Sequence, residues 1–99
     1  MKLLTKNLIK KTPKLNAQES NADPKLYIKF VEPVSNWVWY VMEYDPKEKL
    51  FFGVVCGFDV EFGYFSLAEL ESFKNKLERD LSFKPCHLSE LGLFKERSS

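Results

Sequence analysis

The sequence predicts an α+β domain, in which a capped helix and an N-terminal helix pack against an antiparallel sheet of about four or five strands. Two runs rich in β-branched and aromatic residues, 36–44 and 50–58, flank a turn-forming Asp45-Pro46 and predict a central hairpin. Ser66 and Glu69 form a capping box that opens an apolar pattern of helical period. With 99 residues, 44% of them hydrophobic, the chain suits one core, and we expect a single domain over residues 1–99.

The first third of the chain is predicted to hold a helix, a loop and a strand. Apolar residues recur at near-helical spacing over 3–9, and the helix should end before Pro13, because the residue preceding a proline leaves the helical region. Residues 15–24 are polar and aperiodic, which predicts a mobile surface loop. Residues 26–31 alternate with period two, as in a strand. The residues expected on its buried face are Leu26, Ile28 and Phe30.

The central hairpin should be apolar on both faces. If Tyr44 pairs with Phe51, one face carries Trp37, Trp39, Val41 and Glu43, and the other carries Val38, Tyr40, Met42 and Tyr44. A slip of one residue would set Trp37 over Gly57 instead. Gly53 and Gly57 share a face, where we expect a helix or an aromatic ring to pack closely, with a shallow partner groove as the alternative. The second face requires a helix or a partner to cover it.

The capping box fixes the start of the main helix in the remaining third of the chain. There the Ser66 hydroxyl accepts from the amide of Glu69, whose carboxylate reaches back to the amide of Ser66. The elements expected in order are a turn over 59–63, a short strand over 62–65, a helix from Leu67 to about Leu77, a strand over 78–84 that Pro85 ends, and a helical turn over 88–91 with Gly92 as C-cap.

Charge and hydropathy exclude several classes of protein. Fifteen basic and fourteen acidic residues leave a net charge of +1, which lacks the basic excess typical of nucleic-acid-binding proteins. No apolar run reaches the length of a membrane span or has the shape of a signal peptide, so we expect a cytoplasmic protein without a membrane partner. In that compartment Cys56 and Cys86 are expected to be free thiols.

No catalytic motif stands out in the sequence, and we expect neither a cofactor nor a metal. His87 and Cys86 lack the spacing of zinc ligands, and neighbours on an extended chain point to opposite sides, so they cannot act as a nucleophilic pair. The glycines do not form a phosphate-binding loop.

Acidic residues are the remaining candidates for chemistry. Glu43 and Asp45 share a face at a strand end and could hold a divalent cation, with Glu61 and Asp80 converging on them if the sheet order allows. This acidic cluster would suit a small metal-dependent hydrolase or a nucleic-acid-processing enzyme. The plainer interpretation is that Asp45 sets the turn and the others solvate strand ends. Arg79, between two acidic residues, could form a partly buried ion pair.

Aromatic residues are more numerous than one sheet face can bury. Tyrosine and tryptophan are enriched at protein interfaces, because they give large contact area with few rotatable bonds and a polar tip. Stacking on single-stranded nucleic acid would also use them, but it normally requires a cationic groove. A place in the core is the alternative for each. The predicted partner-binding residues are Trp37, Trp39, Tyr40, Tyr44 and Tyr64.

Several segments together resemble domain-of-unknown-function family 2958. The segments that carry this resemblance are 1–5, 13–15, 35–40, 43–46, 50–53, 57–58, 63–67, 69–70, 78–81 and 83–85. The resemblance implies a small cytoplasmic protein encoded on plasmids, integrative conjugative elements or phages, with no established activity. Small accessory proteins of such elements often bind a host or element-encoded protein. The leading hypothesis is therefore a non-enzymatic protein-binding accessory factor of a mobile genetic element that counteracts a host defence.

Overall fold

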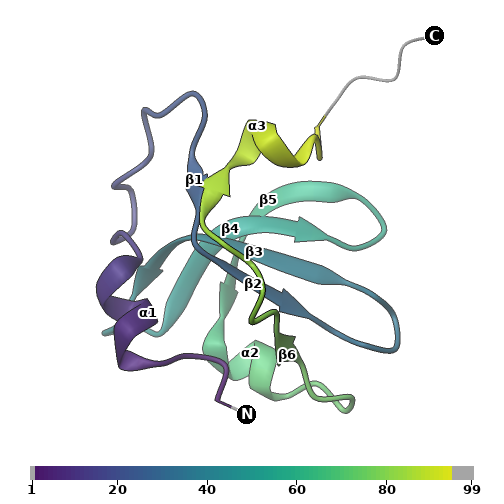
Figure 1. The fold of residues 1–99 in the computed structure, drawn as a ribbon. Coiled ribbons are helices and arrows are strands. Elements are labelled where there is room, and N and C mark those ends of the chain that lie inside the picture. Colours follow the sequence, from purple (N-terminus) through teal and green to yellow (C-terminus); the bar gives the residue numbers. More distant parts are fainter. Residues whose placement is uncertain (1, 95–99) are drawn as a thin grey trace, which may run out of the picture.

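The computed structural model describes residues 2–94 and confirms the α+β class (Figure 1). Its strands are β1 (Lys25–Leu26), β2 (Ile28–Val31), β3 (Val38–Asp45), β4 (Leu50–Cys56), β5 (Val60–Ser66), β6 (Glu78–Arg79) and β7 (Cys86–His87). Its helices are α1 (Lys6–Lys11), α2 (Leu67–Glu71) and α3 (Leu88–Leu91). The main sheet is antiparallel with the order β5-β4-β3-β2-β6, and β1 pairs with β7 in a second sheet. Within the described part of the chain, no helix has the length and apolar character needed to cross a membrane.

Helix α1 ends before Pro13 as predicted but begins at Lys6, so Leu3 and Leu4 of the predicted helical pattern precede it. The Thr5 hydroxyl accepts a hydrogen bond from the amide of Leu8 at 3.2 Å, which satisfies one of the free donors of the first turn. The helix ends at Lys11, and Thr12 adopts the extended backbone expected immediately before Pro13. Lysines in the last turn complement the negative end of the helix dipole.

The central hairpin contains both of the registers considered from the sequence. Tyr44 pairs with Phe51, whereas Trp39 pairs with Val55, and a β-bulge at Met42 separates the two registers. The extra residue interrupts the alternation of side chains. Tyr44 therefore lies in the same core cluster as Trp39, whereas regular alternation predicts opposite faces.

Gly53 of β4 and Gly57 in the turn after β4 both have close neighbours, and at Gly57 the neighbour is an aromatic ring, as predicted. A Cβ at Gly57 would lie 2.5 Å from the ring of Trp37, so the indole packs directly on bare backbone. A Cβ at Gly53 would overlap the carbonyl oxygen of Tyr40 on the neighbouring strand. Both positions require glycine for steric reasons.

The strand predicted over 26–31 is divided at Tyr27. Leu26 is fully buried but belongs to the core on one face of the sheet, whereas Ile28 and Phe30 belong to the core on the other face. The amide of Tyr27 donates to the carbonyl of Val41 at 2.8 Å, so the chain stays attached to β3 across the break. The prediction that Leu26 shares a face with Ile28 is therefore wrong, because the chain leaves the main sheet to pair with β7.

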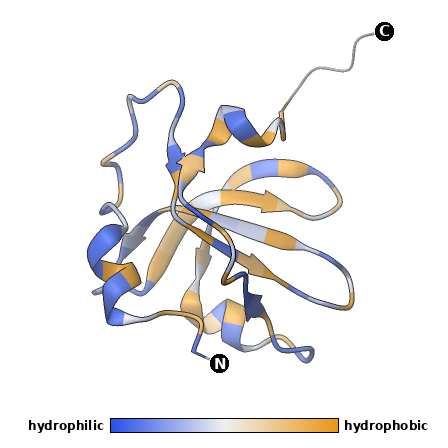
Figure 2. Ribbon diagram, viewed as in Figure 1, coloured by the Kyte–Doolittle hydropathy of each residue, from blue (hydrophilic) through white to orange (hydrophobic). Residues whose placement is uncertain are grey.

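Each face of the sheet is covered by other parts of the same chain. One core lies beneath α1 and α2, and its buried residues are Leu3, Ile28, Phe30, Trp39, Val41, Tyr44, Phe51, Phe65, Leu70 and Leu77. The other lies beneath α3 and the C-terminal segment, and its buried residues are Leu26, Tyr40, Met42 and Val54. Figure 2 shows the corresponding hydrophobic stretches along the strands.

Strand β5 is longer than predicted. It pairs with β4 from Val60 to Ser66, so the turn falls at 57–59 and the expected turn over 59–63 is wrong. The capping box of the following helix is present as predicted, with the Ser66 hydroxyl accepting from the amide of Glu69 at 3.0 Å. Gly92, with φ of 62°, ends α3 as the predicted C-cap.

Helix α2 is shorter than predicted because the chain must cross the sheet. It ends at Glu71, and residues 72–77 continue without helix to β6. Strands β5 and β6 lie at opposite edges of the sheet, four interstrand steps or about 19 Å apart. A helix over 67–77 would rise only about 16 Å. The non-helical residues 72–77 make this connection instead, and Leu77 still enters the core.

Strand β6 is also shorter than the predicted strand over 78–84. After Arg79 the chain turns at Asp80, whose carboxylate accepts from the amide of Ser82 at 2.9 Å and from its hydroxyl at 2.6 Å. Such a local bond gives the backbone an alternative to the sheet ladder. The turn sends the chain over the second face, where Phe83 contacts Tyr40 with ring centroids 5.7 Å apart.

Candidate functional site

The structure separates the five aromatic residues predicted to bind a partner. Trp39, Tyr40 and Tyr44 are buried, with exposed fractions of 4%, 8% and 4%. Burial raises the pKa of the Tyr40 and Tyr44 hydroxyls. Trp37 is half-buried, and Tyr64 is 60% exposed. Of these five residues, Trp37 and Tyr64 offer surface to a partner. The bulge turns Tyr44 into the core, the C-terminal segment covers Tyr40, and Trp39 packs in the core against Phe73.

Strand β5 forms one edge of the main sheet (Figure 1). Two backbone hydrogen bonds mark the ends of the β4–β5 ladder. The amide of Leu67 donates to the carbonyl of Lys49 at 3.0 Å, and the amide of Gly57 donates to the carbonyl of Asp59, also at 3.0 Å. Hydrogen-bonded positions alternate along an antiparallel ladder. Odd-numbered residues of β5 therefore bond to β4, and even-numbered residues direct their N–H and C=O groups outward. The outward residues are Val60, Phe62, Tyr64 and Ser66.

On one side of β5 four aromatic rings form a cluster. Phe52 contacts Tyr64 and Phe62, with ring centroids 4.8 Å and 6.2 Å apart. Phe62 stacks on Phe94 at 5.1 Å. Phe62, Tyr64 and Phe94 are 47%, 60% and 44% exposed, so the cluster presents its rings to solvent.

A second pair of rings lies at the β4–β5 turn. Trp37 and Phe58 meet edge to face with centroids 5.2 Å apart, and Phe58 is 94% exposed. A shallow depression of about 350 Å³ between this pair and β5 has Gly57 and Gly63 among its lining residues. We call the edge of β5 together with both groups of rings the aromatic edge. Its residues are Trp37, Phe52, Phe58, Phe62, Tyr64 and Phe94.

Sequence reasoning missed Phe58, Phe62 and Phe94 as surface residues. Phe62 falls where the predicted turn over 59–63 overlaps the predicted short strand over 62–65. The available signal was the alternation of Val60, Phe62 and Tyr64, which continues the strand pattern through the supposed turn.

A cavity of about 370 Å³ adjoins the aromatic edge. One wall is formed by Phe52, Phe62 and Tyr64, and the opposite wall by the loop before β1. Glu43 lies at its base and is 3% exposed. Its two carboxylate oxygens accept from the amides of Asn16 and Gln18, at 2.9 Å and 2.8 Å.

Gln18 ties the same loop to the strands behind it. Its side-chain amide nitrogen donates to the carbonyls of Lys25 and Met42, at 2.9 Å and 3.0 Å, and its amide oxygen accepts from the amide of Lys25 at 2.7 Å. The loop over 15–24, predicted to be mobile, is thus fastened at Gln18 and at the buried Glu43.

The predicted acidic cluster does not assemble. Glu43 is engaged by loop amides, and Asp45 accepts from the amide of Lys47 at 3.0 Å, which sets the β3–β4 turn. Glu61 is an exposed residue of β5, and Asp80 lies just past β6 at the opposite edge. Within residues 2–94, no three histidine, cysteine or acidic side chains lie together in a group that could hold a metal ion.

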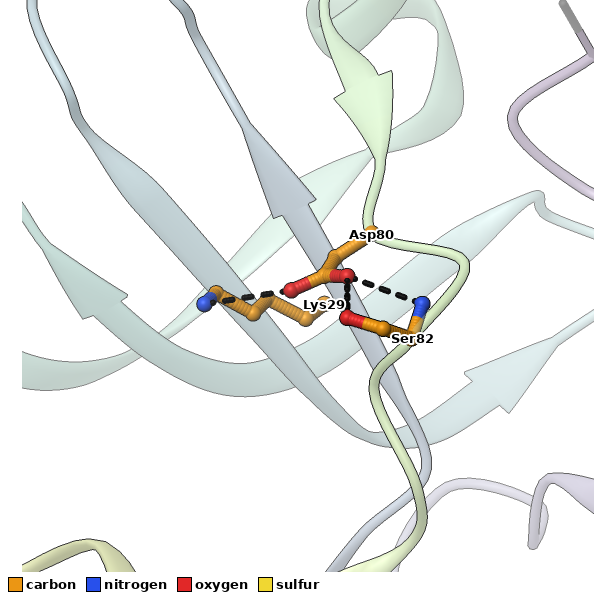
Figure 3. Close-up of polar contacts among 3 residues, drawn as sticks. All are labelled: Lys29, Asp80 and Ser82. Atoms are coloured by element: carbon orange, nitrogen blue, oxygen red, sulfur yellow. Dashed lines mark hydrogen bonds and ion pairs between the residues drawn. The ribbon is translucent and has the colours of Figure 1, made fainter.

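An ion pair near β6 joins Lys29 and Asp80. Lys29 of β2 approaches Asp80 at 3.3 Å (Figure 3), and this carboxylate also accepts from Ser82. These hydrogen bonds from Ser82, together with Lys29, lower the pKa of Asp80. Arg79 donates to the backbone carbonyls of Lys2 and Leu3, at 2.7 Å and 3.0 Å. The guanidinium thus attaches the N-terminal segment to the sheet.

The cysteine and histidine side chains are partly buried or hold a loop in place. Cys56 and Cys86 are free thiols, as predicted, and partial burial raises the pKa of both. A raised pKa lowers the thiolate fraction, which is the nucleophilic form. His87 Nδ1 lies 2.9 Å from the carbonyl oxygen of Asp23, where it helps to hold the loop against α3.

Comparison with known proteins gives a family and no activity. No curated protein and no solved structure matches the chain. The family model described as "Protein of unknown function (DUF2958)" matches residues 2–95, which is nearly the whole sequence. The chain therefore belongs to the DUF2958 family.

Proposed function

We propose that this protein is a non-enzymatic binding factor that recognises another protein through the aromatic edge. The observation that carries the proposal is a seven-residue edge strand, β5, flanked on both sides by solvent-exposed aromatic rings. An extended segment of a partner can pair with the outward N–H and C=O groups of such a strand, while its side chains enter the neighbouring depressions.

The composition of β5 supports this role. Natural proteins protect edge strands with lysine, proline or a bulge, because an open edge pairs readily with other chains. Strand β5 contains neither lysine nor proline, its register with β4 is regular throughout, and Glu61 is its one charged residue. The edge strand at the other side of the sheet, β6, is only two residues long.

The roles of the acidic residues favour binding over hydrolysis. Glu43, Asp45 and Asp80 accept hydrogen bonds that hold a loop or a turn. Each carboxylate thus has a structural task at its own place in the fold. The carboxylate-based hydrolase considered from the sequence would need them at one place.

The resemblance to the family supplies the biological context of the proposal. It implies a cytoplasmic accessory protein encoded on a plasmid, an integrative conjugative element or a phage. We propose that the partner is a host or element-encoded protein and that binding counteracts a host defence.

Site-specific photo-cross-linking tests the proposal. A photoreactive phenylalanine analogue at Phe58, expressed in a host that carries the element, should yield a discrete adduct that mass spectrometry identifies. Tyr64→Ser should reduce the adduct at least several-fold. Leu81→Ser is the matched control, because Leu81 is 71% exposed beside β6 at the opposite edge, and it should leave the adduct unchanged. Adducts that form equally well with Tyr64→Ser would remove the support for the aromatic edge.

A further inference from the structure

Gly63 in the middle of β5 has no steric role within one molecule. A Cβ built on Gly63 meets no atom within 4 Å, in contrast to Gly53 and Gly57, where a Cβ would collide. Its φ lies outside the left-handed range, so its conformation does not call for glycine either. Interior strand glycines often mark the close approach of another backbone.

The pattern of β5 is self-complementary about this glycine. In an antiparallel pair of two copies with Gly63 opposite Gly63, Phe62 of each copy lies opposite Tyr64 of the other, and Val60 lies opposite Ser66. Phe62 and Tyr64 direct their N–H and C=O groups outward, so they form the hydrogen-bonded pairs of the new ladder, whereas the N–H of Ser66 already donates to Glu69 in the capping box. Gly63 then falls at a non-hydrogen-bonded pair, where Cα atoms come closest, at about 4.5 Å.

The side chains agree with this register. Phe62 and Tyr64 lie on the same side of β5 and are exposed, so the pairing makes two aromatic cross-strand pairs, an arrangement that stabilises sheets. Glu61 of each copy faces Phe65 of the other, which keeps the two carboxylates about 13 Å apart. A twofold axis relates the copies, as in most homodimers.

We propose that two copies of this chain associate through β5, with the twofold axis at Gly63, to form one continuous antiparallel sheet. A second copy occupies the outward groups of β5 in this dimer, so another protein that binds the dimer does so at the Trp37–Phe58 pairs rather than along β5. The dimer places both Trp37–Phe58 pairs at the two ends of the joined strands, where they remain available to a further protein. The inference uses the aromatic edge of the proposed function but does not require that a host partner exists.

Cysteine substitution on the same face of β5 tests the register. Gly63→Cys places thiols at Cα atoms about 4.5 Å apart, within the range of a disulfide. Under oxidised glutathione this variant should form a covalent dimer at least tenfold faster than Glu61→Cys, whose thiols would be about 13 Å apart. Wild type, which carries the same native Cys56 and Cys86, serves as the control for other disulfides. Equal rates for the two variants would overturn the proposal.

Light scattering of the unmodified protein gives the second measurement. The mass of wild type should rise with concentration from 11.6 kDa toward twice that value. Tyr64→Lys should hold the mass at 11.6 kDa, because an edge lysine opposes strand pairing, whereas Leu81→Lys should behave as wild type. A wild type that stays monomeric at the highest concentration overturns the dimer, while adducts at Phe58 would still support the proposed function.

Discussion

At the scale of single residues, the glycines of the β4–β5 hairpin show how neighbours decide what a residue does. Gly57 lies beneath the indole of Trp37, Gly53 lies against the backbone of Tyr40, and Gly63 faces open space. Gly53 and Gly63 lie inside strands and Gly57 lies in the turn between these strands, and glycine loses more conformational freedom on folding than any other residue. Only the surroundings distinguish a glycine that the fold requires from one that it does not.

This difference gives a matched pair of substitutions. Gly57→Ala should lower the free energy of unfolding by about 1–3 kcal/mol, because the added methyl group would displace the Trp37 ring. Gly63→Ala should leave it unchanged or raise it by up to about 1 kcal/mol, because the unfolded chain loses freedom and nothing clashes. Urea unfolding at dilute concentration measures both. An equal loss for the two variants would contradict the packing described for Gly57.

At the scale of elements, the β-bulge at Met42 positions a side chain of β3 that holds a loop in place. The register shift places Glu43 beneath the loop before β1, where its carboxylate accepts from the amides of Asn16 and Gln18. Without the shift, Glu43 would alternate onto the face of Trp39. A local irregularity in β3 thereby fixes a loop that forms one wall of the cavity beside the aromatic edge.

Removing this carboxylate should release the loop. Glu43→Ala should lower the free energy of unfolding by about 1–3 kcal/mol, because two amides lose their acceptor in a buried place. Limited proteolysis should become faster within residues 15–24. General destabilisation of the sheet would instead increase cleavage throughout the chain. Glu61→Ala, at an exposed position of β5, is the control and should change neither measurement. Unchanged cleavage in Glu43→Ala would show that the loop is held by other contacts.

At the scale of the whole molecule, the carboxylates of Asp23 and Asp80 join segments that are distant in the sequence, and that of Glu32 holds a local turn. Asp23 accepts from Ser89 and holds the loop to α3, and Asp80 pairs with Lys29 across two strands. Glu32 accepts from Ser35 in the β2–β3 turn. Each carboxyl group has its pKa lowered by hydrogen bonds from a serine: Asp23 by Ser89, Glu32 by Ser35 and Asp80 by Ser82.

Acid should therefore destabilise the fold. A carboxyl group whose pKa is lower in the folded than in the unfolded state stabilises the fold at pH values above its ordinary pKa, which is 3.8 for aspartate and 4.5 for glutamate. This stabilisation is lost as the pH falls through the pKa that the group has in the folded state. The melting temperature should be level above about pH 5 and fall below about pH 4.5. Glu32→Gln should flatten part of this fall, whereas Glu48→Gln, in the exposed β3–β4 turn, should not. A melting temperature independent of pH between 5 and 3 would contradict the prediction.

The sequence determined by itself the elements that local chemistry specifies. Runs of β-branched and aromatic residues produced β3 and β4, Thr5 and Ser66 began helices with their hydroxyls, and Gly92 ended one with a left-handed conformation. These signals extend over a few residues, so they are visible without knowledge of distant contacts.

Only the tertiary structure decided which aromatic residues reach the surface. Tyr40 is buried because residues 80–94 return over its face, and Tyr44 is buried because one bulge turns it to the other face. Tyr64 is exposed because β5 is the last strand on its side of the sheet. Strand order and register depend on pairing between residues far apart in the chain, and no local pattern encodes that pairing.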